Sequence, residues 1–218
     1  MAAYRYDYDV IAQWIGHSEK VLDLGCGDGG LLRHLIETRQ VRGYGVENDP
    51  EKILACVKNG ISVIQADMDR GLTGFDDGSF DHVIMSLSLQ AMHNTQGILA
   101  EMLRVGRGAV VSFPNFGYWQ HRQSILNGRM PVSESLPYQW FDTPNVRFFT
   151  IDDFEALCAQ AGIAIHKRLA FDEGRIIDAD PNFLASVAVY RLGRDRDRHS
   201  WSTESTLTNK APIGLMKN

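Results

Sequence analysis

The sequence predicts an α/β domain built on a doubly wound, mostly parallel sheet of seven strands. Apolar runs of strand length, such as HVIMSL and AVVSF, suit strands that are buried on both faces. They alternate with segments whose apolar residues recur at helical spacing. A glycine cluster at residues 25–30 joins the first strand to the first crossover helix. Such strand–helix alternation is typical of a parallel sheet with helices on both faces.

The expected elements follow one another without an internal repeat. The strands are predicted at residues 20–24, 41–47, 62–66, 80–87, 109–113, 163–170 and 183–192. Helices are predicted at residues 7–15, after the glycine cluster, at 50–58, at 95–105 and from Thr150 onward. Thr150 and Asp153 have the spacing of a capping box, which favours a helix start there.

Two regions depart from this alternation. Residues 115–150 are long, aromatic and contain three prolines, so we expect an insertion after the fifth strand. We expect about half of its eight aromatic residues in the core, and the others in a lid or a partner surface. These are Phe116, Tyr118, Trp119, Tyr138, Trp140, Phe141, Phe148 and Phe149. Residues 193–218 are polar and aperiodic, so the folded domain is expected to span 1–192, followed by a disordered tail.

Composition excludes several classes of protein. The net charge of −5 gives no general attraction to nucleic acid or to anionic membranes. Three scattered cysteines without a CxxC pair argue against a disulfide framework and against a zinc site, so no metal is expected. No apolar stretch has signal-peptide character or approaches the roughly 20 residues of a membrane span. We therefore expect a cytoplasmic protein.

The turn DLGCGDGG, residues 23–30, contains a GxGxxG pattern, and Glu47 follows Gly27 by 20 residues. This spacing also occurs in dinucleotide-binding proteins, where the turn holds a pyrophosphate. Asp23 and Asp28, however, place negative charge where those phosphates would lie, and such repulsion is unfavourable at low dielectric. The charges therefore disfavour NAD or a nucleotide sugar, and favour a ligand with positively charged groups.

Acidic residues also end the next two predicted strands. Glu47 is placed to accept hydrogen bonds from ribose hydroxyls, and Asp67 to accept one from an adenine amino group. Met68 offers an apolar contact for the adenine ring. These positions lie at the carboxyl ends of parallel strands, where open α/β sheets bind ligands. The pattern predicts S-adenosylmethionine as the cofactor, against the alternative of a turn that binds nothing.

The motifs VLDLGCGDG, GYGVE and QAD resemble those of class I S-adenosylmethionine-dependent methyltransferases. The resemblance implies a Rossmann-like fold, with Asp23 and Gly25 at the methionine portion of the cofactor and Ser86 and Ser88 facing it. The expected cofactor-binding residues are Asp23, Gly25, Cys26, Gly27, Asp28, Glu47, Asn48, Asp67, Met68 and Ser86.

Further segments are similar to the MetW proteins of methionine biosynthesis. They are LAEMLRVGR, VSFPNFGYWQHR and GRMPVSESLPYQWFDTPNVRFFTIDDFEALC. This resemblance implies a link to homoserine O-acyltransferase, as partner or regulator. Two hypotheses stay open: a methyltransferase with an unknown acceptor, and a non-catalytic regulatory partner of the acyltransferase.

A catalytic residue is harder to predict. No Asn-Pro-Pro-aromatic motif follows the fourth strand, where the chain reads SLSLQ at residues 86–90. His93 lies just beyond and is the candidate base, with His121, Tyr118 and Asp142 as weaker candidates. The sequence favours the alternative that His93 is a surface histidine at a loop–helix junction, without a catalytic role. Positioning supplies much of the rate of a methyl transfer, so a base is not always required.

Overall fold

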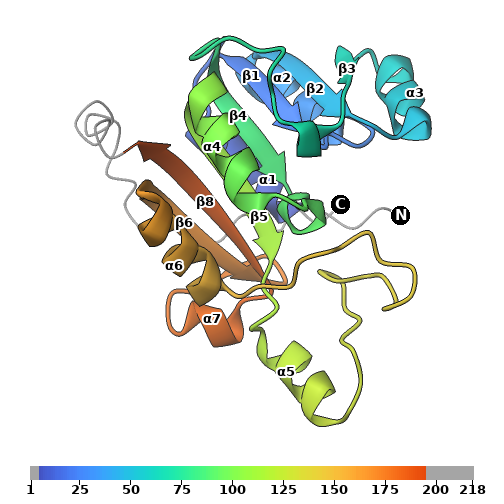
Figure 1. Cartoon of the computed structure of the whole chain (residues 1–218), viewed down its shortest axis with the longest axis vertical. Coiled ribbons are helices and arrows are strands. Elements are labelled where there is room, and N and C mark those ends of the chain that lie inside the picture. Colours follow the sequence, from blue (N-terminus) through green and yellow to red (C-terminus); the bar gives the residue numbers. More distant parts are fainter. Residues whose placement is uncertain (1–4, 195–218) are drawn as a thin grey trace, which may run out of the picture.

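A computed structural model of the chain describes residues 5–194 and contains one eight-stranded sheet (Figure 1). The strand order is β3-β2-β1-β4-β5-β8-β6-β7. The strands are β1 (Lys20–Leu24), β2 (Arg42–Glu47), β3 (Val63–Gln65), β4 (Phe80–Ser86), β5 (Gly106–Pro114), β6 (Ile163–Asp172), β7 (Arg175–Ile176) and β8 (Val187–Arg194). Neighbouring strands among β1 to β5 pair in parallel, whereas β8 runs antiparallel to both β5 and β6. The predicted doubly wound, mostly parallel sheet is confirmed.

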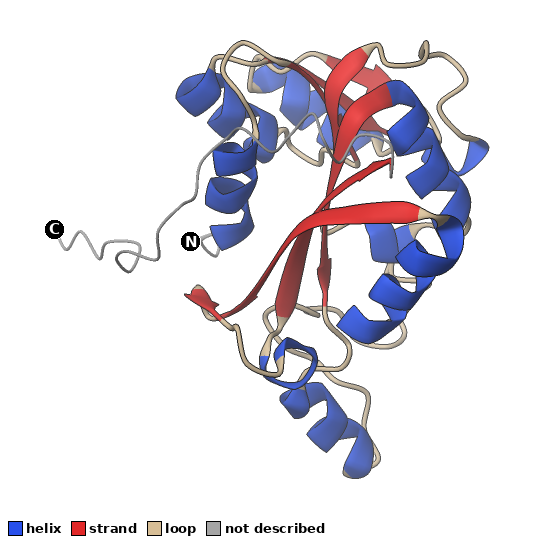
Figure 2. Cartoon of the chain, turned by 90° about the vertical axis from the view of Figure 1, so that its left-hand side faces the viewer, coloured by secondary structure: helices blue, strands red, loops and turns tan. Residues whose placement is uncertain are grey.

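Helices cover both faces of this sheet (Figure 2). They are α1 (Tyr6–Trp14), α2 (Gly30–Arg39), α3 (Pro50–Lys58), α4 (Thr95–Val105), α5 (Trp119–Leu126), α6 (Ile151–Ala161) and α7 (Pro181–Leu184), with 3₁₀ turns η1 (Met68–Arg70) and η2 (Leu89–Ala91). Buried residues of α1, α2 and α3 form one apolar core, and those of α4 and α6 form another. The two cores lie on opposite faces of the sheet, as a doubly wound fold requires.

The predicted start of α6 is confirmed in detail. The hydroxyl of Thr150 accepts a hydrogen bond from the backbone N–H of Asp153, and the Asp153 carboxylate accepts one from the backbone N–H of Thr150. This reciprocal pair satisfies two N–H groups that have no partner inside the helix. The helix ends at Gly162, whose φ of 66° is the left-handed conformation that glycine adopts most easily.

The carboxyl-terminal part of the sheet corrects three predictions. The count of seven strands is wrong by one, because β7 follows a tight turn after β6 and, at two residues, is too short to show a period. The strand predicted at 183–192 begins only at Val187, since Pro181 starts the short helix α7. Gly193 and Arg194, expected in the tail, pair with Ala164 and Ile163 as the end of β8. The rest of the predicted tail lies outside the described residues.

The predicted insertion begins directly after β5 and ends at α6, and its helix α5 projects away from the sheet (Figure 1). The expectation that half of its aromatic residues belong to the core is wrong. Five of the eight are exposed, namely Trp119, Tyr138, Trp140, Phe141 and Phe148. The physical reason is that α5 and the loop after it extend beyond the sheet, so few of their side chains reach either core. Within residues 5–194, no helix has the length and apolar character needed to cross a membrane.

Candidate cofactor-binding site

The glycine turn after β1 lies close to the end of β2 and to the loop that follows β4. Gly25 and Gly27 have φ values of 71° and 59°, a left-handed backbone conformation that is unfavourable for residues with a side chain. The backbone N–H of Gly25 donates to the carbonyl of Val46 at 2.8 Å, which ties the turn to β2. A Cβ atom at Gly25 would lie 3.0 Å from Cβ of Ser88 and 3.5 Å from Cε of Met68. The turn thus leaves a cradle that any side chain at position 25 would fill.

Glu47, the last residue of β2, organises this turn. Its carboxylate is almost fully buried and accepts backbone hydrogen bonds from Gly27 at 3.0 Å, Asn48 at 2.9 Å and Asp49 at 3.1 Å. A carboxylate has about four acceptor positions, so one is left for a ligand hydroxyl. The sequence predicted the position of Glu47 at a strand end but not its hold on the glycine turn.

A crevice with a volume of about 340 Å³ opens at this edge of the sheet. Five of the ten predicted cofactor-binding residues line it: Gly25, Glu47, Asn48, Asp67 and Met68. Asp69 and Lys52 add two further charged side chains. Tyr138, Pro144 and Asn145 of the insertion also line the crevice, so the insertion reaches over the predicted cofactor site.

Asp23 lies behind the crevice rather than on its surface. The residue is 2% exposed at the end of β1. Burial raises the pKa of its carboxyl to about 8; the nearby charge of Arg5 opposes this shift, and Asp7 and Glu47 add to it. In the absence of a cationic ligand, a large part of Asp23 is therefore protonated at neutral pH.

Three other predicted residues of the turn play local structural roles. The Cys26 side chain points into the core, where its sulfur lies 3.7 Å from that of Cys56. Burial raises the pKa of the Cys26 thiol, as expected for a packed rather than a reactive cysteine. The exposed Asp28 accepts a hydrogen bond from the backbone N–H of Gly30 at 3.0 Å, at the start of α2. Gly27 supplies the N–H group that Glu47 holds.

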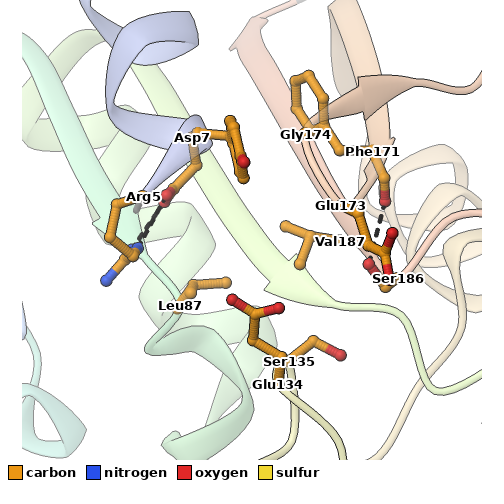
Figure 3. Close-up of a pocket in the computed structure, with 11 residues that line it drawn as sticks. Arg5, Asp7, Leu87, Glu134, Ser135, Phe171, Glu173, Gly174, Ser186 and Val187 are labelled. Carbon is orange, nitrogen blue, oxygen red and sulfur yellow. Dashed lines mark hydrogen bonds and ion pairs between the residues drawn. The ribbon is translucent and has the colours of Figure 1, made fainter. Parts of the chain in front are cut away.

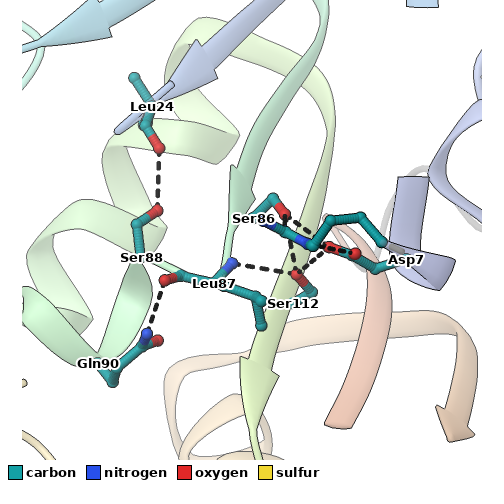
Figure 4. Close-up of polar contacts among 8 residues, drawn as sticks. Asp7, Leu24, Ser86, Leu87, Ser88, Gln90 and Ser112 are labelled. Atoms are coloured by element: carbon teal, nitrogen blue, oxygen red, sulfur yellow. Dashed lines mark hydrogen bonds and ion pairs between the residues drawn. The ribbon is translucent and has the colours of Figure 1, made fainter. Parts of the chain in front are cut away.

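Ser86 does not line the crevice, but the residues that follow it do. Figure 4 shows the contact between Ser86 and Asp7. The Ser86 hydroxyl lies 2.7 Å from both the Arg5 guanidinium and the Asp7 carboxylate. Leu87 has a φ of 49°, a strained value for a residue with a side chain, and its N–H donates to the Ser112 carbonyl at 3.0 Å. Ser88 lines the crevice and donates to the carbonyl of Leu24.

The catalytic candidate His93 is 71% exposed and does not line the crevice. Its Nδ1 lies 2.9 Å from the carboxylate of Asp69, which does line it. Partial burial alone would raise the pKa of Asp69, but hydrogen bonds from the His93 ring and from the backbone of Asn94 and His93 hold it below its usual value. The Asp69 carboxylate is therefore negatively charged where it lines the crevice, and His93 stabilises that charge.

The weaker candidates in the insertion are mostly structural. His121 is buried, with Nδ1 3.0 Å from the Asn115 carbonyl and Nε2 2.8 Å from the Ser133 hydroxyl. Burial lowers the pKa of His121, so the ring is neutral at pH 7. Burial, with a hydrogen bond to Asp172, raises the pKa of Tyr118 to about 12. Asp142 is exposed on the loop and lines neither this crevice nor the cavity described below.

The sequence did not reveal the residues that the insertion and α3 bring to the crevice. Tyr138 and Asn145 come from a loop without regular structure, so no periodicity places them. The position of Lys52 near the crevice could have been predicted, because Lys52 lies in the first turn of the helix that follows Glu47.

Residues 5–192 match the family model described as methionine biosynthesis protein MetW. The chain belongs to the MetW family. A curated relative from Rhodopirellula baltica, the bifunctional methionine biosynthesis protein MetXA/MetW, is 39% identical over 203 residues. The match covers 87% of this chain and 33% of that relative, so this chain spans about a third of the bifunctional protein. The predicted resemblance to MetW is thereby confirmed.

Solved structures with the same fold include S-adenosylmethionine-dependent methyltransferases. One from Mesorhizobium loti has a TM-score of 0.65 at 17% identity, with 87% of this chain and 98% of that chain covered. Another is the putative methyltransferase of Haloferax volcanii in complex with the Trm112 methyltransferase activator, with a TM-score of 0.62 at 17% identity and coverage of 86% and 88%. At these identities the likeness shows the Rossmann-like methyltransferase fold.

Proposed function

We propose that this MetW-family protein binds S-adenosylmethionine in the crevice beside Gly25 and acts as a methyltransferase in methionine biosynthesis. The observation that carries the proposal is the buried Glu47 carboxylate, which fixes the glycine turn and keeps an acceptor position for a ribose hydroxyl. The cradle at Gly25 fits a ligand that lies against the backbone.

The charge of the crevice supports this cofactor over a dinucleotide. Glu47, Asp67 and Asp69 line the crevice and Asp23 lies behind it, against the single cation of Lys52 among its lining residues. A pyrophosphate would be repelled by this excess of carboxylates, whereas a sulfonium and an ammonium group would be attracted. The coarse class of ligand thus follows from the sign of the local charge.

Each residue has a distinct part in this proposal. Glu47 accepts from the ribose, Asp67 accepts from the adenine amino group, and Met68 packs against the ring. Asp23, once ionised, faces the positively charged end of the cofactor. S-adenosylmethionine supplies an electrophilic methyl group when bound, and the chain contributes by holding that group in a fixed orientation.

Isothermal titration calorimetry tests the proposal with three ligands: S-adenosylmethionine, S-adenosylhomocysteine and NAD. We expect one site per chain for the first two and no binding of NAD. Binding of NAD in place of S-adenosylmethionine would overturn the choice of cofactor. Incubation with methyl-labelled cofactor and cell extract then tests transfer, because a binding module would bind the cofactor without labelling any acceptor.

A second candidate function is that of a non-catalytic regulatory partner of homoserine O-acyltransferase in the cytoplasm. Two observations favour it. The relative from Rhodopirellula baltica joins a MetW part to a MetXA part in one chain. In addition, the insertion exposes the large apolar side chains of Leu126, Trp140 and Phe141, which are 80%, 72% and 70% exposed. Clusters of exposed aromatic residues are typical of protein interfaces.

Co-purification of the acyltransferase with this protein, with and without S-adenosylhomocysteine, tests the second candidate. A stable complex whose yield changes with the ligand is expected for a regulator. An acyltransferase that is equally active and stable without this protein would contradict it.

A further inference from the structure

A second cavity, with a volume of about 130 Å³, lies beside Leu87 (Figure 3). Leu87 lines both this cavity and the proposed cofactor crevice, so they share a wall. Four further parts of the chain complete the cavity: the start of α1, the insertion, the turn between β6 and β7, and the start of β8. None of the residues predicted to bind the cofactor lines it.

The carboxylates in this cavity are not balanced by a free cation. The guanidinium of Arg5 is paired with Asp7, through contacts of 2.8 and 2.7 Å, which leaves Glu134 and Glu173. Neither glutamate has a salt bridge with another residue of the described range 5–194. Two unpaired carboxylates at one small cavity favour a cationic ligand.

The remaining wall is apolar and aromatic. Its apolar and aromatic residues are Tyr6, Leu87, Phe171 and Val187. Aromatic faces attract organic cations and apolar side chains pack against hydrocarbon, so the wall suits the carbon part of an amine. A cavity of roughly 150 Å³ in another protein accommodates benzene, which sets the scale of ligand that this one can hold.

The wall is held in place by specific packing. Gly174 has a φ of 77°, and a Cβ atom there would lie 2.7 Å or less from three atoms of the Tyr6 ring, so only glycine lets α1 close against the β6–β7 turn. On the insertion side, the hydroxyl of Ser135 lies 3.2 Å from that of Ser133, which is bonded to the buried His121. These contacts fix two distant segments at the cavity.

We propose that this cavity binds a small primary amine of about the size of a single ring, with its ammonium group between Glu134 and Glu173. One part of the inference rests on the proposed function, namely that the bound amine is the methyl acceptor. The ammonium group first loses one proton to solvent, which frees the nitrogen lone pair. That lone pair would form the N–C bond as the S–C bond breaks, and the bonding pair of the S–C bond stays on sulfur.

Three probes of equal shape test the charge preference: benzylamine, benzyl alcohol and benzoate. Their binding is measured by NMR titration of the full chain, in the absence and in the presence of saturating S-adenosylhomocysteine. We expect benzylamine to bind at least tenfold more tightly than benzyl alcohol, and benzoate to bind most weakly. Equal binding of the three probes would overturn the proposal, as would displacement of benzylamine by S-adenosylhomocysteine.

Variants locate the site. Replacement of both glutamates, Glu134→Gln with Glu173→Gln, is expected to reduce the affinity for benzylamine to that for benzyl alcohol. The affinity for S-adenosylhomocysteine is expected to stay unchanged. Glu37→Gln, an exposed residue of α2 outside both cavities, is the matched control and is expected to change neither. Unchanged benzylamine binding in the double variant would overturn the assignment of the cavity.

The two proposals fail separately. If S-adenosylhomocysteine binds and benzylamine does not, the amine site is wrong and the cofactor proposal stands. If benzylamine binds through Glu134 and Glu173 but no S-adenosyl ligand binds, the cavity is an amine site and the proposed methyltransferase function is wrong.

Discussion

The crevice beside Gly25 and the cavity beside Leu87 share a wall but are built in different ways. Gly25 and residues 47–48 and 67–68 reach the crevice from the ends of three consecutive strands, each within a short motif. The cavity combines residues 5–7, 87, 134–135, 171–174 and 186–187, which only the tertiary fold brings together. A site built from strand ends can therefore be found in the sequence, whereas a site built between distant loops needs the structure.

The largest expected effect concerns the crevice. Glu47→Gln replaces a carboxylate that accepts three backbone N–H groups by an amide with one acceptor oxygen. Hydrogen bonds to a charged group contribute about 1.5–3 kcal/mol each, so we expect S-adenosylhomocysteine affinity to fall about 100-fold in calorimetry. Glu51→Gln, in the exposed first turn of α3, is the control and should bind normally. Wild-type affinity in the Glu47 variant would show that the crevice is not organised as described.

Variants of the insertion should weaken binding of the acyltransferase and leave binding of the cofactor unchanged. Trp140→Ala combined with Phe141→Ala removes two exposed, mutually packed rings whose centroids lie 5.7 Å apart. If this surface binds the acyltransferase, interfacial aromatics contribute about 2 kcal/mol or more, and the complex should weaken at least tenfold by surface plasmon resonance. Binding of S-adenosylhomocysteine should not change. Leu54→Ala, at an exposed apolar position on α3, is the control, and equal losses in both variants would refute a specific role of the insertion.

The packing behind the glycine turn can be tested by stability. A Cβ atom at Gly45 would lie 2.4 Å from the Cys26 sulfur, so Gly45→Ala should destabilise the fold by about 1–3 kcal/mol in urea unfolding. Cys26→Ala removes that sulfur, and the double variant should therefore lose less stability than the sum of the two single variants. If the changes in the free energy of unfolding were strictly additive, the two residues would not be in steric conflict in the Gly45→Ala variant.

The smallest expected effect on ligand binding separates the charge of the cofactor from its shape. Asp23→Asn should weaken S-adenosylmethionine about tenfold, and S-adenosylhomocysteine, which lacks the sulfonium charge, by less. Because ionised Asp23 is the form that favours the cation, the affinity of the wild-type protein for S-adenosylmethionine should rise as the pH rises toward 8. Equal losses for the two ligands would argue that the Asp23 charge does not contact the sulfonium.

The same carboxyl predicts the pH dependence of stability without ligand. Its pKa of about 8 in the folded state lies above its ordinary value of 3.8, so the folded protein binds more protons than the unfolded chain between these limits. The contribution of Asp23 to stability is therefore full below about pH 4 and falls as the pH rises to 8. Asp23→Asn should remove this fall, so its melting temperature relative to wild type should be higher at pH 9 than at pH 4.

The sequence predicted the regular part of the fold because its signals are local. The apolar run of β1, the glycines after it and the capping box of α6 each act within a few residues. The elements it missed, α5, α7 and β7, are short, and α5 is also weakly amphipathic, so their sequences show little periodicity. Gly193, near the end of β8, illustrates the limit. A Cβ atom there would clash with the His166 ring, and nothing in the local sequence signals that contact.

The candidate site divides in the same way. Gly25, Glu47 and Asp67 line the crevice as predicted, since each lies at or just after a strand end. Ser86 also ends a strand, yet it bonds with Arg5 and Asp7, because the start of α1 lies against that part of β4. The positions of strand ends are therefore predictable, but the partners that compete for their side chains are not.

A crystal structure of the protein with S-adenosylhomocysteine tests the central claim most directly. The account predicts a ribose hydroxyl at the Glu47 carboxylate, the adenine between Met68 and Asp67, and the amino-acid end toward Asp23. An empty crevice at saturating ligand, or a ligand bound elsewhere with Glu47 contacting only the backbone, would contradict it.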